Sequence, residues 1–442
     1  MKTVKTACLL MLLSSSSLYA ASVQVGLDRV AAHRALFAGK RIGIIANHTA
    51  YDSRGTHIVN VFKAMPGVQV VALFSPEHGL YGTTEAGAIV DSQIDPTFGL
   101  PVRSLYGRTQ KPTPEMLRDV DLLVFDIQDI GARFYTYIYT MSLAMEAAAE
   151  CGKAFVVLDR PNPINGLAVE GPILESPFAT FVGLYPIPVR HGMTAGELAR
   201  MFNSEGWLAN AARADLTVVP MQGWHRDMWY DQTSLSFRKP SPNMPDLETA
   251  TVYPGPCLIE GTNISEGRGT PRPFRQIGAP WLDSEALATR LNRLNLPGLQ
   301  FAPASFTPTA SKHKGVRCHG VQFIVTDRER LEPFWTGVLI VNEVYRADPD
   351  KFAWRQAHFD RLCGTATIRE AIIAAESLTS LKKRWENECQ AFRKLRHQYL
   401  LYPPHESRAA ALGGNAISAI RVRSDLTVPL SSGCTRFVRM IR

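Results

Sequence analysis

Short apolar runs alternate with amphipathic segments through the first half of the chain. Five of these runs are rich in Val, Ile, Leu and Phe and are too short to be helices. Such runs are typical of strands that are buried on both faces, as in a parallel sheet. The predicted strands are residues 41–46, 68–74, 121–125, 154–158 and 216–219.

Segments with helical periodicity separate the predicted strands. Thr194 and Glu197 have the spacing of a capping box, which marks the start of a helix. Strands that alternate with helices predict a mostly parallel α/β sheet with right-handed crossovers, a Rossmann-like domain. The predicted helices are residues 57–65, 114–120, 137–149 and 194–202.

The pattern changes after residue 224, where a polar, proline-rich stretch runs to residue 251. We interpret this stretch as the crossing between two domains. A helix, a strand and two further helices are predicted beyond it, at residues 283–295, 320–327, 331–345 and 378–399. The fold class is therefore α/β: a Rossmann-like domain over residues 22–240, then a smaller α+β domain over residues 241–402. The small residues and scattered arginines of residues 403–442 predict a disordered tail.

Residues 1–21 have the pattern of a secretory signal peptide. Lys2 and Lys5 precede a short apolar run and a serine stretch, and Ala20 and Ala21 offer small residues for cleavage. The alternative, a membrane anchor, is disfavoured because the run is well short of the ~20 apolar residues of a spanning helix. We expect an exported, periplasmic protein whose mature chain has no stable membrane insertion.

Composition and charge narrow the function classes. Hydrophobic residues make up 45% of the 442 residues and charged residues 20%, which indicates an ordinary globular protein. Of the net charge of +8, Lys2 and Lys5 account for +2 and residues 403–442 for +4, which leaves +2 for the body. Nucleic-acid binding needs a concentrated basic face, so no nucleic-acid partner is predicted.

The number and spacing of the cysteines argue against a disulfide-stabilised fold and against a structural zinc site. Six of the seven cysteines follow the predicted cleavage site, at wide spacing and without a C-x-x-C pair. This spacing fits neither a disulfide framework nor a structural zinc site. We expect at most one disulfide and mainly buried thiols.

The predicted strands end in polar residues. In parallel sheets, ligands bind beyond the carboxyl ends of the strands. Asn47 and His48 follow the first strand here, and the motifs SPEHG, DIQD and DRPNP begin at residues 75, 126 and 159. No G-x-G-x-x-G follows any strand, so a dinucleotide site is not predicted.

Glu77 is the strongest candidate for a general acid. Pro76 restricts the backbone before it and Gly79 frees the backbone after it, so the carboxyl group is held stiffly at a strand end. His78 is a candidate for tuning Glu77 or for binding substrate. The alternative is that Glu77 caps the next helix or pairs with an arginine.

Residues 126–137 bring many polar side chains together after one strand. Asp126, Asp129, Arg133 and Tyr135 suit a polar ligand, and the aromatic rings suit a sugar. The alternative is a solvent-facing loop with an internal Asp–Arg pair.

Two more segments carry candidate substrate ligands. Arg190 and His191 precede the capped helix, where the guanidinium can bind an anionic group of the substrate. The alternative is that this segment is only the turn that leads into the helix. Residues 260–270 are rich in glycine, which would let a ligand approach the backbone closely. The alternative is a structural turn. The candidate ligands in this second segment are Glu260, Asn263, Glu266 and Arg268.

Metal and serine chemistry are weaker hypotheses. His48, His78, His191, Asp126 and Asp129 can in principle converge on one ion, but none of them forms a spaced ligand pair. No G-x-S-x-G elbow is present. We therefore predict no metal site and no cofactor, with metal-dependent hydrolysis kept as an alternative.

Taken together, these motifs resemble those of the exo-β-N-acetylmuramidase family of glycoside hydrolases. The resemblance covers about residues 25–402 and implies a cleft between the two domains as the active site. It implies release of terminal N-acetylmuramic acid from the non-reducing end of peptidoglycan fragments, with Glu77 as the catalytic glutamate. It rests on SPEHG (75–79), DIQDIGARFYTY (126–137), DRPNP (159–163), PVRHG (188–192), PSPNMP (240–245) and EGTNISEGR (260–268).

The implied substrate adds roles for charged residues. Muramic acid carries a lactyl carboxylate, which Arg133, Arg190 or Arg268 can bind. Asp129, Glu260 or the substrate's own 2-acetamido group can serve as the second catalytic group, so the stereochemistry stays open. The leading hypothesis is an exo-acting glycosidase of cell-wall turnover that acts on peptidoglycan-derived muramic-acid saccharides. The alternative is a non-catalytic muropeptide-binding protein of the periplasm.

Overall fold

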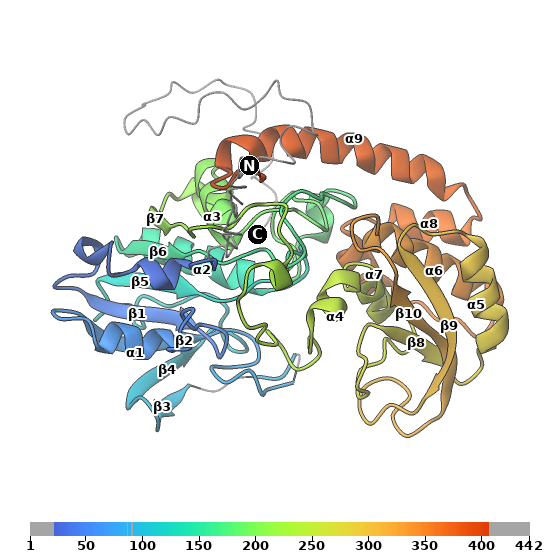
Figure 1. Cartoon of the computed structure of the whole chain (residues 1–442), viewed down its shortest axis with the longest axis horizontal. Coiled ribbons are helices and arrows are strands. Elements are labelled where there is room, and N and C mark those ends of the chain that lie inside the picture. The colour runs from blue at the N-terminus through green and yellow to red at the C-terminus, as the bar shows by residue number, and fades with distance from the viewer. Residues whose placement is uncertain (1–21, 86, 90–91, 406–442) are drawn as a thin grey trace, which may run out of the picture.

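The computed structural model describes residues 22–85, 87–89 and 92–405, which form two sheets with their own helices (Figure 1). The predicted signal peptide lies outside these residues, as does the predicted tail apart from residues 403–405.

The first sheet has seven strands in the order β3-β4-β2-β1-β5-β6-β7. All neighbouring pairs are parallel except β3 and β4. Each of the five strands predicted from apolar runs is present to within one residue, because those runs fill the interior between two helical layers. The strands are β1 (Arg41–Ala46), β2 (Gln69–Ser75), β3 (Gln93–Asp95), β4 (Leu100–Ser104), β5 (Leu122–Asp126), β6 (Ala154–Leu158) and β7 (Asp215–Val219).

Two parts of this domain differ from the prediction. β3 and β4 were not predicted, because an edge hairpin that is partly exposed carries no continuous apolar run. Residues 114–120 form successive turns instead of the predicted helix. The amide groups of Arg118 and Val120 bond to carbonyls three residues back, so the backbone does not enter a regular α-helix there.

The helices of the first domain are α1 (Ile58–Lys63), α2 (Tyr137–Glu150) and α3 (Ala195–Ser204). The capping box is present at the start of α3: the Thr194 hydroxyl accepts from the Glu197 amide at 3.2 Å, and the Glu197 carboxylate accepts from the Thr194 amide at 3.1 Å. α2 is buried on almost every side.

The second domain has a small antiparallel sheet in the order β8-β10-β9, covered by helices. Its longest helix, α9, runs from this domain back to the first one (Figure 1). The predicted strand and three predicted helices correspond to β10, α5, α6 and α9; the shorter elements were not predicted. The elements are α4 (Leu247–Val252), β8 (Gln276–Ala279), α5 (Ser284–Arg293), β9 (Leu299–Phe306), β10 (Cys318–Val325), α6 (Pro333–Ala347), α7 (Gln356–Cys363), α8 (Thr367–Ile373) and α9 (Leu378–Arg396).

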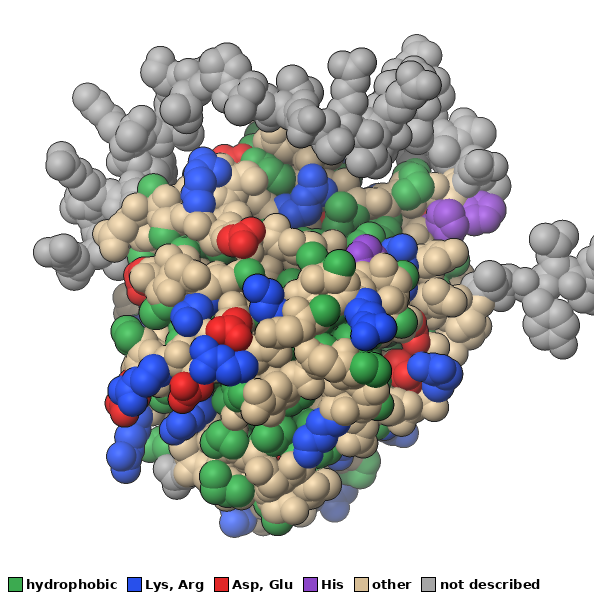
Figure 2. Space-filling view, turned by 90° about the vertical axis from the view of Figure 1, so that its left-hand side faces the viewer, with side chains coloured by type: hydrophobic (Ala, Val, Ile, Leu, Met, Phe, Trp, Pro, Cys, Tyr) green, Lys and Arg blue, Asp and Glu red, His purple; other side chains and the backbone are tan. Residues whose placement is uncertain are grey.

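On the face shown in Figure 2, basic side chains lie among acidic ones. All five cysteines that the structure describes are free, and four of them are buried, as predicted; Cys434 lies outside the described residues. Among the described helices, none is both long and apolar enough to cross a membrane.

Arg133 joins the two domains. It was predicted to bind substrate, but its side chain is fully buried. Nη1 donates to the carbonyls of Pro172 and Ile187 at 2.8 and 3.0 Å, and Nη2 donates to the carbonyl of Leu362 on α7 at 3.0 Å. Burial lowers its pKa to about 10, so the guanidinium stays charged at neutral pH. Arg133 therefore fixes α7 against the first domain.

Substitution of Arg133 tests this structural role. Arg133→Met keeps most of the side-chain length but leaves three buried carbonyls without their donor. We expect the free energy of unfolding to fall by about 3 kcal/mol or more, measured by urea denaturation. Arg118→Met is the control, because that side chain is 72% exposed and its change is expected to stay within about 0.5 kcal/mol. Equal effects of the two substitutions would contradict the role.

Candidate active site

A cavity of about 580 Å³ lies between the two domains. An adjoining hollow of about 490 Å³ shares part of its wall, including Glu260, Arg268 and Arg355. The first domain contributes Glu77, His78, Tyr106, Gln110, Tyr135, Thr136 and Phe181 to the cavity; the segments from residue 241 onward contribute Ser241, Asn243, Glu260, Arg268, Arg355, His358 and Arg361.

Glu77 lies in this cavity, directly beyond the end of β2. The backbone turns sharply after it, since His78 and Gly79 both have positive φ, 70° and 75°. The Glu77 carboxylate accepts a hydrogen bond from the Thr136 hydroxyl at 2.8 Å on Oε2 and from the Gly87 amide at 3.0 Å on Oε1. The carboxyl group is thus held in one orientation by contacts from two separate segments, and not by an arginine.

Two further hydrogen-bonding side chains, His78 and Tyr106, line the cavity beside Glu77. His78 contacts the carbonyl of Thr84 through Nδ1 at 2.7 Å, which stabilises the loop after Glu77. Burial, together with the nearby Glu77 carboxylate, raises the pKa of Tyr106 well above its usual value. Tyr106 therefore keeps its proton and can donate it in a hydrogen bond inside the cavity.

Asp129 and His191 lie close together outside the set of residues that line the cavity. Asp129 Oδ2 accepts from the Gly131 amide at 2.7 Å and lies 3.9 Å from His191 Nε2. Burial raises the pKa of Asp129 to about 7 and lowers that of His191 to about 3. His191 is therefore neutral, and the Asp129 carboxyl group is partly protonated at neutral pH.

Glu260 and Arg268 form a charged wall on the side of the second domain. The Glu260 carboxylate lies 2.5 Å from Arg268 Nη2 and 3.5 Å from His358 Nε2. Burial alone would raise the pKa of Glu260, but the charge of Arg268 and the hydrogen bonds with His358 and Arg268 lower it to about 2. Glu266 pairs with Arg268 at 3.1 Å and with Lys312 at 2.8 Å. Arg268 is thus shared between two carboxylates.

Four more residues predicted to bind substrate form hydrogen bonds or ion pairs within the protein, and none of them lines this cavity. Asp126 forms a buried ion pair with Arg160, with 2.9 Å between Oδ2 and Nη2, so its arginine comes from outside residues 126–137 and the segment is not the solvent-facing loop with an internal pair that the sequence left as the alternative. Arg190 donates to the carbonyl of Ile164. Asn47 and Asn263 organise loops through backbone contacts with Thr49, Lys351 and Ala353. These side chains support the framework of the site.

Several residues of the cavity wall were missed by sequence reasoning. Arg355, His358 and Arg361 recur every third residue along one helix, a periodic signal that was available in the sequence. Tyr106 and Phe181 pack with their ring centroids 6.0 Å apart and form an aromatic part of the wall. Because these two residues are far apart in the sequence, no local motif predicts that they pack together.

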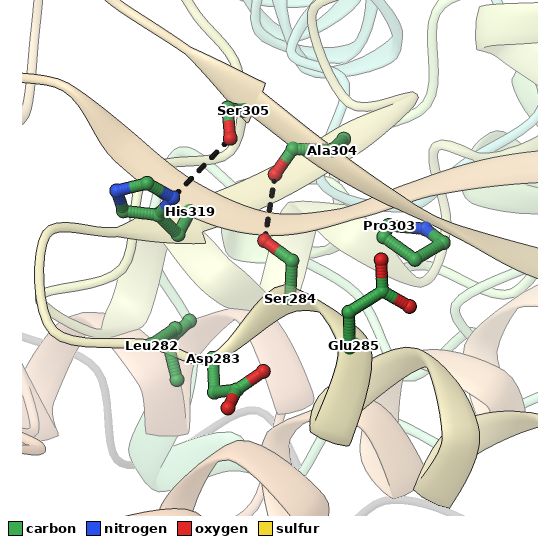
Figure 3. A pocket seen from close by; sticks show the side chains of 8 residues that line it. All are labelled: Leu282, Asp283, Ser284, Glu285, Pro303, Ala304, Ser305 and His319. Carbon is green, nitrogen blue, oxygen red and sulfur yellow. Dashed lines mark hydrogen bonds between the residues drawn. The ribbon is translucent and has the colours of Figure 1, made fainter.

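A metal site and a second ligand pocket are the two other possibilities. Within the part of the chain that the structure describes, no three His, Cys, Asp or Glu side chains are grouped to hold a metal ion. A surface depression of about 590 Å³ lies over the small sheet (Figure 3). Its polar groups bond locally, with Ser284 donating to the Ala304 carbonyl at 2.9 Å and Ser305 contacting His319 at 3.2 Å.

Comparison with known proteins identifies the family. Residues 42–248 match the N-terminal part, and residues 251–402 the C-terminal part, of the family described as exo-β-N-acetylmuramidase NamZ. The chain is 51% identical over 382 residues to the peptidoglycan β-N-acetylmuramidase NamZ of Bacillus subtilis. The aligned region covers 86% of this chain and 91% of that protein.

Two crystal structures of DUF1343 family proteins from Bacteroides fragilis have the same fold. One has a TM-score of 0.80 at 39% identity, covering 86% of this chain and 99% of the other. The second has a TM-score of 0.69 at 32% identity, covering 87% and 99%. The sequence match across both domains and the shared two-domain architecture lead to one conclusion: the chain belongs to the exo-β-N-acetylmuramidase NamZ family.

Proposed function

We propose that this protein is an exo-acting glycosidase that releases terminal N-acetylmuramic acid from the non-reducing end of peptidoglycan fragments. The observation that carries the proposal is the placement of Glu77: a rigidly held carboxyl group opens into an interdomain cavity lined by aromatic and charged side chains. Membership of the family and the name of the Bacillus subtilis relative support it.

Glu77 serves as the general acid in this mechanism. The protonated carboxyl group gives its proton to the glycosidic oxygen while the bond from that oxygen to C1 of the muramic acid breaks. Water then supplies a hydroxyl group to C1, and its remaining proton restores the acid form of Glu77, so the products are free N-acetylmuramic acid and the shortened saccharide. The Thr136 hydroxyl and the Gly87 amide keep the carboxyl group oriented through this step.

The rest of the cavity suits a sugar ring. Tyr106 and Phe181 offer aromatic faces, and Gln110, Ser241 and Asn243 offer hydrogen-bonding groups. Of the candidates for a second catalytic group in the protein, Glu260 lines the cavity and is ionised, whereas Asp129 lies outside the lining. We therefore assign Glu260 to the stabilisation of positive charge that develops on the sugar.

The same proposal includes export. The signal-peptide pattern of residues 1–21 supports secretion to the periplasm, where peptidoglycan-derived muramic-acid saccharides are the partners.

The role of Glu77 is tested by Glu77→Gln, which keeps the size of the side chain and removes the acid. Hydrolysis of a chromogenic β-N-acetylmuramide is expected to fall by about 100-fold or more, because no group is left to protonate the leaving oxygen. Glu115→Gln is the matched control, since that carboxylate is 81% exposed and away from the cavity. Unchanged thermal unfolding shows that the fold is intact; turnover near the wild-type rate would remove Glu77 from this role.

The ionised state of Glu260 predicts how stability depends on pH. Its folded pKa of about 2 lies below the ordinary value of 4.5, so its contribution is present above about pH 4.5 and is lost as the pH falls toward 2. Glu260→Gln should therefore lower stability near pH 7 by about 2 kcal/mol and flatten the loss of stability between pH 5 and 3. Thermal unfolding across this range measures both effects. A variant with the wild-type pH profile would contradict this assignment.

Export is tested by placing a charge in the apolar run. Leu10→Arg is expected to leave the precursor uncleaved in the cytoplasm of a Gram-negative host, whereas the wild-type protein is recovered from the periplasm. Mass spectrometry of the recovered protein should locate cleavage after Ala20 or Ala21. Recovery of an intact amino terminus from the wild-type protein would be evidence against a cleaved signal.

A further inference from the structure

The cavity contains two arginines that form no ion pair within the described residues, one directly before α7 and one within it. We propose that Arg355 and Arg361, at the start of α7 and within it, bind the lactyl carboxylate of the muramic acid and thereby select this sugar. The inference rests on the proposed function and extends it to the recognition of one substituent of the substrate.

The other cations of this wall are already neutralised. Arg268 pairs with Glu260 and Glu266. Lys312 pairs with Glu266 and also donates to two carbonyls, and His358 lies beside Glu260. An incoming carboxylate would have to displace one of these carboxylates in order to bind there. Arg133 and Arg190, the other arginines predicted to bind it, are buried and donate to backbone carbonyls.

Arg355 and Arg361 differ from these cations in both exposure and pairing. Both side chains line the cavity and both residues are exposed. Neither guanidinium has an ion pair or a side-chain hydrogen bond in the part of the chain that the structure describes. Each therefore keeps its full set of donors for a ligand.

The spacing along the chain directs both side chains to one side. Arg355 directly precedes α7, and His358 and Arg361 lie within it, three residues apart on one face. All three side chains line the cavity, whereas Phe359 and Cys363 of the same helix are fully buried. The three side chains therefore form a basic edge of the cavity.

This edge is held in place by backbone contacts. The Arg355 amide donates to the Gly261 carbonyl at 2.8 Å, and the Leu362 carbonyl accepts from Arg133 at 3.0 Å. A Cβ atom added to Gly261 would lie 2.5 Å from the backbone of Phe359, so α7 packs as closely as the chain allows. A fixed helix presents guanidinium groups with little rearrangement on binding.

The chemistry of the substrate explains why this edge matters. N-acetylmuramic acid differs from N-acetylglucosamine by the lactyl ether, whose carboxylate is the negative charge of the sugar. A guanidinium matches a carboxylate with two parallel hydrogen bonds, and the neutral sugar cannot make this contact. Glu77 belongs to the first-domain part of the wall, so the two arginines also draw the negative substituent to the α7 side.

The experiment compares a chromogenic β-N-acetylmuramide with its lactyl methyl ester, which is neutral and similar in size. In the Arg355→Gln/Arg361→Gln double variant, kcat/KM for the free acid is expected to fall about tenfold or more, mainly through KM, while the ester changes less than about twofold. Arg361→Lys should retain part of the preference, because its charge remains without the bidentate geometry. Arg293→Gln on α5 is the control, since it is an exposed arginine outside the cavity.

The outcomes separate this inference from the proposed function. Wild-type protein that cleaves neither substrate would overturn the proposed function. In that case, calorimetry with free N-acetylmuramic acid and N-acetylglucosamine still tests the arginines: loss of the preference for the acid in the double variant supports them, and an unchanged preference overturns them. With active enzyme, an equal change for acid and ester, or no change for either, overturns the inference.

Discussion

The buried guanidinium of Arg133 is the contact on which the geometry of the site depends. Its three hydrogen bonds join the carbonyls of Pro172 and Ile187 to that of Leu362, which lies more than 150 residues further along the chain. The largest apolar cluster of the described residues also crosses from the first sheet to the helices of the second domain. The two walls of the cavity are therefore parts of one packed interior, and the contact with Leu362 sets where α7 lies.

The two walls of the cavity carry different groups: a single carboxyl group on the first domain and several charged side chains on the second. The first domain supplies a carboxyl group at the end of a parallel strand, held by Thr136 and Gly87, where rigid backbone limits its motion. The second domain supplies most of the charge, with Glu260 and Glu266 balanced by Arg268 and Lys312. In the proposed function, a sugar bound between them would meet an acid from the first domain and charged side chains from the second. Such prearranged groups need little reorganisation during the reaction.

Some carboxylates at the strand ends pair inside the protein and others face the cavity, and the residue type alone does not show which. Asp126 is the last residue of β5, and Glu77 lies two residues after the end of β2 in the same sheet. Asp126 is neutralised by Arg160 within the protein, whereas Glu77 opens into the cavity. Burial of a charge requires a partner, and the partner of Asp126 comes from the end of the neighbouring strand β6. The ion pair from the neighbouring strand end thus leaves Asp126 inside the protein, whereas the carboxylate of Glu77 stays open to the cavity.

The sequence by itself determined the parallel sheet, the capped helix at Thr194, the two-part organisation and the position of Glu77 just beyond a strand end. These features depend on local periodicity, on the residues next to a turn and on motifs that are contiguous in the chain. Only the tertiary structure decided that Arg133 is a structural residue and that Arg355 and Arg361 face the cavity. An arginine's role depends on whether carbonyls or open space surround its donors, and those surroundings come from segments far apart in the chain.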